Sequence, residues 1–168
     1  MMYLRRGVLW TMLVMLNASA MANQALDELN TLLAKKQTST ALAKPKVTSE
    51  IKNLSDNYYF VFIYKGTCPH CHNFAPILSD FAKTFNVQVQ SYSMDAAPLD
   101  EFQGEPLTPE LFQTFYVNSG YKPSVPALFL VNRHTADAYA VLFGEAEDYE
   151  LARRVHELVK HIEEKYHA

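Results

Sequence analysis

Apolar residues fall along the chain in two kinds of pattern, short unbroken runs and longer segments with helical spacing. The run at 58–64 (YYFVFIY) has the length of a strand and no polar interruption, as expected for a strand buried on both faces. Residues 73–85 repeat apolar side chains at helical spacing, and a less regular alternation at 87–94 indicates a second strand. The first half of this region therefore predicts strand, helix, strand.

The second half of the region continues the alternation after a polar loop at 95–107. Thr108 and Pro109 suit the N-cap and first position of a helix. The predicted helix, strand, strand and helix lie at 109–118, 126–132, 137–144 and 147–166. Strands alternating with helices predict an α/β sandwich built around a βαβ unit.

The first 22 residues differ from the rest and predict an export signal. Arg5 and Arg6 precede an apolar run at 8–16, and small residues ending at Ala22 follow it. The run has about nine residues, whereas a helix that spans a bilayer needs roughly 20. We expect cleavage after Ala22 and a protein located in the periplasm.

The exported chain is predicted to contain one domain. Residues 23–48 read as a short helix followed by a flexible linker, and residues 49–168 as the domain. Loss of the two arginines moves the formal net charge from -3 to -5. No basic stripe is present to neutralise phosphates, so nucleic acid is excluded as an expected partner.

The chain has two cysteines, Cys68 and Cys71, and they lie in GTCPHCH at the junction of the first strand and first helix. A disulfide closing so small a loop removes little chain entropy and is a poor structural staple. The pair therefore indicates chemistry. With His72 the same residues form CxxCH, the attachment pattern of a c-type haem, and thiolates with imidazoles also suit zinc.

The order of elements favours a redox-active dithiol over these alternatives. Proteins with a covalent haem embed the motif among helices, whereas here a buried strand precedes it and two more lie downstream. A structural zinc site needs four ligands, and the chain has a single CxxC pair. We therefore expect no cofactor and no metal.

Four features together resemble the thioredoxin superfamily over residues 50–166. They are Cys68-Pro69-His70-Cys71, Pro76 in the following helix, the dipeptide Val125-Pro126, and Gly144 at the end of a strand. The resemblance implies a three-layer sandwich with CxxC at the N-terminus of the first core helix. It also implies a cis proline before the third core strand.

Longer stretches resemble the periplasmic thiol-disulfide isomerases of F-type conjugative transfer systems. These stretches are YYFVFIYKGTCPHCHNFAPIL, LTPELFQTF and VPALFLVN. The resemblance implies an isomerase that assists folding of disulfide-bonded conjugation or pilus-assembly proteins. Its partners would be cysteine-containing exported proteins and a membrane or periplasmic redox partner.

Each candidate site residue has an expected role. Cys68 is at a helix start, where unpaired amides and the helix dipole favour a thiolate, and Cys71 one turn inward would resolve the mixed disulfide. Pro69 and His70 lie between them, and His70 is expected to stabilise the thiolate. By resemblance, Val125 and Pro126 hold the substrate backbone.

The sequence also departs from the resemblance and leaves alternatives open. Phe62 occupies the position where many thioredoxin-like proteins carry a buried carboxylate that accepts a proton. The Pro-His dipeptide resembles that of periplasmic disulfide oxidases, so an oxidase is one alternative. A second is a binding or assembly module, in which leucines at 26–33 contact a partner or a second copy of the chain.

Overall fold

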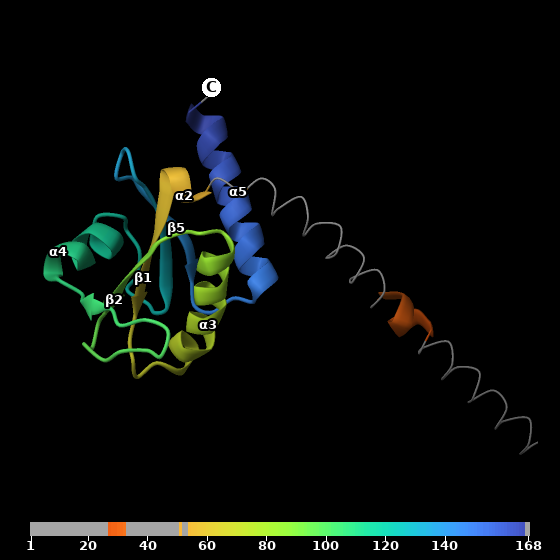
Figure 1. The fold of residues 1–168 in the computed structure, drawn as a ribbon, viewed down its shortest axis with the longest axis horizontal. Helices are drawn as coiled ribbons and strands as arrows, with labels where there is room; N and C mark the ends of the chain where they lie inside the picture. Colours follow the sequence, from red (N-terminus) through yellow and green to blue (C-terminus); the bar gives the residue numbers. More distant parts are fainter. Residues whose placement is uncertain (1–26, 33–50, 52–53, 167–168) are drawn as a thin grey trace, which may run out of the picture. The chain divides into compact units, whose positions relative to one another are not determined.

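The computed structural model describes residues 27–32, 51 and 54–166 (Figure 1). The predicted export signal and most of the predicted segment 23–48 lie outside these residues, so both stay predictions. The chain divides into two units, 1–43 and 44–168, and the sheet belongs to the second.

In the first unit, residues 27–32 are helical, and Leu29 and Leu32 are exposed. Within the described ranges, no helix combines the length and the apolar character that a bilayer crossing requires.

The strands of the described residues form one sheet in the order β3-β2-β1-β4-β5. They are β1 Tyr58–Tyr64, β2 Val89–Ser93, β3 Glu105–Pro106, β4 Ala127–Asn132 and β5 Ala138–Phe143. The central strand β1 runs parallel to β2 and antiparallel to β4. The four predicted strands are confirmed, with small shifts at their ends.

One prediction about the sheet was wrong. The segment 95–107 was predicted as a loop, but it contains β3, which pairs in parallel with β2. A strand of two residues is too short to produce a hydrophobic alternation, so no sequence pattern marks it.

The three helices predicted for the domain are found, one of them divided, and a short helix at 54–57 was not predicted. The described helices of the second unit are α2 Leu54–Asn57, α3 Pro69–Thr84, α4 Pro109–Phe112, the π-helical turn η1 Gln113–Val117 and α5 Asp148–Tyr166. The Thr108 hydroxyl accepts a hydrogen bond from the Leu111 amide at 3.3 Å, which confirms the predicted cap. The single helix predicted after it widens instead, since the amide of Asn118 donates to Gln113 five residues back.

The sheet separates two apolar layers because side chains of a strand alternate between its faces. Phe60, Phe62 and Tyr64 of β1 pack with α3 and α5, whereas Val61 and Ile63 pack with η1. Figure 1 shows α3 and α5 together on one side of the sheet and α4 on the other. Burial of each such side chain contributes about 1.5–3 kcal/mol.

This arrangement confirms the predicted three-layer, thioredoxin-like sandwich. The dithiol segment follows β1 and opens α3, as expected. The peptide bond between Val125 and Pro126, just before β4, is cis, which confirms the implied isomer.

Candidate active site

The two cysteines lie where the central strand passes into α3. Cys68 is the N-cap of the helix, in extended backbone conformation, and Pro69 takes the first helical position, where a missing amide costs nothing. The amide of Cys68 donates to the Lys65 oxygen at 3.1 Å, and that of Cys71 donates to the Cys68 oxygen at 3.0 Å. These bonds fix the turn that joins strand to helix.

Cys68 and Cys71 have different surroundings although both carry free thiols. Cys68 is partly exposed, whereas Cys71 is fully buried. Burial raises the pKa of Cys71 to about 12, and the nearby Cys68 and Asp95 add to the rise, against a backbone hydrogen bond from Lys65. The structure therefore holds one accessible thiol and one that stays protonated.

The predicted substrate-side residues lie beside the accessible thiol. The Cys68 sulfur is 4.0 Å from the backbone oxygen of Val125. The Pro126 oxygen accepts a hydrogen bond from the Gly144 amide at 2.8 Å, which ties this segment to the end of β5. The sequence places Val125 far from the dithiol, and the fold brings them together.

Tyr116 of η1 supports the same segment from the core. Its side chain is fully buried, and its hydroxyl donates to the Ser124 oxygen at 2.8 Å. Burial, with a smaller contribution from the nearby Cys71, raises the pKa of Tyr116, so the phenol remains a donor at neutral pH.

His70 lies on the exposed first turn of α3. Its Nδ1 is 3.2 Å from the Glu145 carboxylate, and Asn73 donates to the other oxygen of that carboxylate at 3.1 Å. Sequence reasoning missed Glu145 because an acid in a loop after β5 carries no motif. Its contact with α3 arises only in the folded chain.

His72, the residue that raised the haem alternative, is exposed. Its Nε2 is 2.7 Å from the backbone oxygen of Gly66. Among residues 27–32, 51 and 54–166, no three His, Cys, Asp or Glu side chains gather as metal ligands.

Asp95 is the second residue that the sequence analysis missed. Its carboxylate accepts hydrogen bonds from the Gly66 amide at 2.9 Å, from the Thr67 amide at 3.1 Å and hydroxyl at 2.8 Å, and from the Ser93 hydroxyl at 2.9 Å. Partial desolvation opposes ionisation, but these bonds outweigh it and hold the pKa of Asp95 well below its usual range. A polar residue directly after a parallel strand is the signal that could have found it.

Phe62 is fully buried beneath this region, as the sequence implied, and packs edge-to-face on Phe74 and Phe102. The missing carboxylate is not replaced by Asp95, because a carboxyl with so low a pKa is a poor proton acceptor.

The segment 95–107 is anchored to the core, although most of its residues are exposed. Leu99 is 1% exposed. Tyr64 of β1 holds the segment from below, since its hydroxyl donates to the Phe102 oxygen at 3.1 Å and accepts from the Gly104 amide at 2.9 Å.

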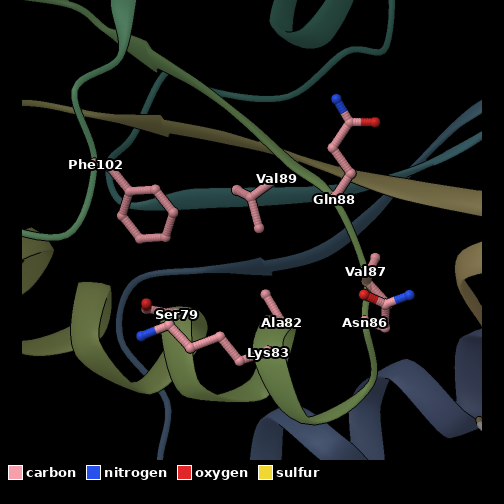
Figure 2. A pocket seen from close by; sticks show the side chains of 8 residues that line it. All are labelled: Ser79, Ala82, Lys83, Asn86, Val87, Gln88, Val89 and Phe102. Atoms are coloured by element: carbon pink, nitrogen blue, oxygen red, sulfur yellow. The ribbon is translucent and has the colours of Figure 1, made fainter.

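A groove on the α3 side of the sheet lies apart from the dithiol. Its lining residues are Ser79, Ala82, Lys83, Asn86, Val87, Gln88, Val89 and Phe102. Figure 2 shows Phe102 and Val89 across the groove from Ser79 and Ala82 of α3. None of the predicted site residues lines it, so it is not the site of the cysteine chemistry.

Two solved structures are similar to parts of this chain. A thiol:disulfide interchange protein of the thioredoxin family from Chlorobium tepidum TLS has a TM-score of 0.48 and 19% identity, covering 61% of this chain and 80% of that chain. The MTB protein dsbF, in mixed oxidized and reduced forms, has a TM-score of 0.40 and 19% identity, covering 64% and 84%.

Sequence comparison extends the similarity beyond the cysteine motif. Protein TrbB of Escherichia coli (strain K12) is 29% identical over 164 residues, which cover 87% of this chain and 88% of that protein. The model of the family "TraF: F plasmid transfer operon protein" matches residues 17–156, well over half of the chain. The chain therefore belongs to the TraF family of F plasmid transfer operon proteins.

Proposed function

We propose that this protein is a periplasmic thiol-disulfide oxidoreductase that works as a disulfide isomerase on proteins of a conjugative transfer system. The observation that carries the proposal is the unequal pair at the start of α3, an accessible Cys68 and a buried Cys71 with a raised pKa. Family membership and the similarity to TrbB support the conjugation context.

The isomerase reaction begins when the Cys68 thiolate attacks one sulfur of a substrate disulfide. The substrate S–S bond breaks, a mixed disulfide to Cys68 forms, and the other substrate sulfur leaves as a thiolate. A different substrate thiolate then attacks the mixed disulfide, forms a new substrate disulfide and regenerates the Cys68 thiolate. No net electrons pass between protein and substrate.

Cys71 can release a substrate that remains bound to Cys68 in the mixed disulfide. When its sulfur, after losing its proton, attacks Cys68 in the mixed disulfide, a Cys68–Cys71 disulfide forms and the substrate leaves reduced by two electrons. A periplasmic or membrane redox partner must then return two electrons to the pair. The raised pKa of Cys71 leaves little of its thiol ionised at neutral pH, which slows this release.

The residues next to Cys68 are proposed to position the substrate and tune the thiolate. The Val125 backbone oxygen lies beside the sulfur, so an extended substrate segment is held there by backbone pairing as at a sheet edge. Pro69 takes the first position of α3, directly after Cys68. His70 modulates the charge near the Cys68 sulfur. The expected substrates are exported proteins that contain cysteine.

The test is reactivation of a scrambled disulfide protein by the reduced form of this protein, purified after export. Wild type is expected to restore activity, and Cys68→Ser is expected to lose it. Cys71→Ser is the matched control, since the same substitution three residues away keeps the attacking thiol and should accumulate mixed disulfides visible by intact mass. Equal loss in both variants without trapped complexes would contradict the assigned roles.

The oxidase alternative has its own outcome in this assay. If the oxidised protein forms disulfides in a fully reduced substrate while the reduced protein restores no scrambled one, the protein is an oxidase and the isomerase proposal is wrong. Reactivation unchanged in Cys68→Ser would favour the binding module.

A further inference from the structure

Glu145 connects the loop after β5 to the first turn of α3. One carboxylate oxygen lies 3.2 Å from His70 Nδ1, and the other accepts from the Asn73 side chain at 3.1 Å. His70 and Asn73 are three residues apart, so they lie on the same face of the helix. The Glu145 carboxylate thus contacts two side chains that lie one helical turn apart on the same face of α3.

The backbone on both sides of Glu145 is fixed, so this contact is built into the fold. Gly144 has φ +93°, a left-handed conformation that favours glycine, and its amide donates to the Pro126 oxygen at 2.8 Å. On the other side Ala146 is buried. The loop therefore presents the carboxylate to α3 beside the segment that contacts Cys68.

We propose that Glu145 is a positioning residue that restrains His70 and makes the Cys68–Cys71 disulfide less oxidising than the Pro-His dipeptide alone would make it. This inference rests on the proposed thiol-disulfide function and concerns its direction. It gives a structural reason why a protein with an oxidase-like dipeptide would work as an isomerase.

The charge near the Cys68 sulfur in the reduced protein sets how readily the disulfide is reduced. A positively charged or hydrogen-bond-donating imidazole stabilises the Cys68 thiolate, and a more stable thiolate makes the disulfide more readily reduced. Here Nδ1 of His70 is within hydrogen-bonding distance of Glu145 instead. The carboxylate–imidazole pair therefore carries less net positive charge than the imidazole alone, and one ring nitrogen fewer is free to donate toward the sulfur.

The direction in which Glu145 changes the charge near the dithiol is the same whether the imidazole is neutral or protonated. Hydrogen bonds from Asn73 and from His70 lower the pKa of Glu145, so the carboxylate is ionised at neutral pH. A carboxylate with an imidazole forms a pair that is neutral or negative, whereas the imidazole without it is neutral or positive. Removing the carboxylate charge therefore never makes the surroundings of the dithiol more negative.

The experiment is equilibration of the purified protein with reduced and oxidised glutathione at pH 7, with free thiols counted by alkylation and intact mass. Glu145→Gln removes the charge and keeps the shape. It is expected to raise the equilibrium constant for reduction of the protein disulfide by about threefold to fivefold. At 29.6 mV per tenfold change this is a rise of roughly 15–20 mV in reduction potential.

Two further variants separate this effect from a general loss of charge or structure. Glu147→Gln removes a carboxylate two residues away and is expected to leave the constant unchanged. In a His70→Ala background, Glu145→Gln is expected to have a smaller effect, because without His70 the exposed carboxylate acts on the sulfur only through solvent. Thermal unfolding of each variant checks that all remain folded.

The outcomes distinguish this inference from the function on which it rests. A constant that is unchanged or lower in Glu145→Gln, or an equal rise in the His70→Ala background, overturns the role of Glu145 while the dithiol chemistry stands. If the wild-type cysteines fail to exchange with glutathione, the proposed function is wrong and the inference is wrong with it.

Discussion

Two carboxylates flank the dithiol, and their partners differ in kind. Asp95, before the helix, accepts hydrogen bonds from the amides of Gly66 and Thr67 and from hydroxyls, none of which titrates near neutral pH. Glu145, on the other side, contacts His70, the titratable residue between the cysteines. Both acids are exposed, so burial does not explain the difference.

The hydrogen-bond partner therefore decides the role of each of these surface carboxylates. Several donors from one loop converge on Asp95 and hold the backbone that leads into Cys68, so its contribution is structural. Glu145 makes contacts that do little for stability at an exposed site but change the charge that the sulfur experiences. Substitutions at the two sites should therefore separate stability from redox behaviour.

Replacement of Asp95 by alanine should have the largest effect on stability. The loss of charge-assisted hydrogen bonds to the 66–67 turn is expected to lower the free energy of unfolding by roughly 2–4 kcal/mol. Urea unfolding followed by circular dichroism measures it, and Asp100→Ala, an exposed acid on the same segment, is the control. Equal small losses in both variants would show that Asp95 does not hold the turn.

Gly66→Ala should disturb the same turn from the opposite side. A Cβ at Gly66 would lie 2.6 Å from the Cβ of Ala97 and 2.9 Å from its backbone, so the segment after Asp95 must move. We expect a loss of roughly 1–3 kcal/mol, as for overpacking. Gly66→Ala in an Ala97→Gly background should recover part of it, and no recovery would mean that the clash lies elsewhere.

Acid should remove the contribution of Asp95. Its pKa is lower in the folded protein than in the unfolded chain, so the ionised form favours folding. The contribution is fully present above the unfolded pKa near 3.8 and is lost as the pH falls through the lower folded value. The stability advantage of wild type over Asp95→Asn should therefore shrink between about pH 5 and pH 2; a constant advantage would contradict the assignment.

Asn73→Ala should give the smallest effect, a change in the equilibrium constant for reduction of the Cys68–Cys71 disulfide by glutathione. It removes one of the two contacts of the Glu145 carboxylate and leaves the charge in place. We expect the equilibrium constant with glutathione to rise less than twofold, in the direction of Glu145→Gln. A rise larger than that of Glu145→Gln would mean that Asn73 acts on the dithiol by another route.

The sequence predicted those parts of the fold that depend on local patterns. The apolar run at 58–64 matches β1 residue for residue, and the cap at Thr108 is where it was expected. The predicted positions of Cys68 and Cys71 at the start of a helix also agree with the structure. In each case the information lies within a few consecutive residues.

The parts that were missed depend on contacts between distant segments. Leu99 is an isolated apolar residue in a polar stretch, and no periodicity marks it as buried. Widening of the helix at η1 leaves no trace in residues that also suit an α-helix. Asp95 and Glu145 belong to no motif and contact the residues beside the dithiol only because β2 and β5 end near the start of α3.

A redox titration of the exported protein in glutathione buffers measures most directly whether Cys68 and Cys71 exchange between dithiol and disulfide. Alkylation and intact mass at each potential report how many thiols are free. We predict that both thiols disappear together at one midpoint, below that of a strong disulfide oxidant such as DsbA at about -120 mV. Cysteines that stay reduced or stay blocked at every potential would contradict the account.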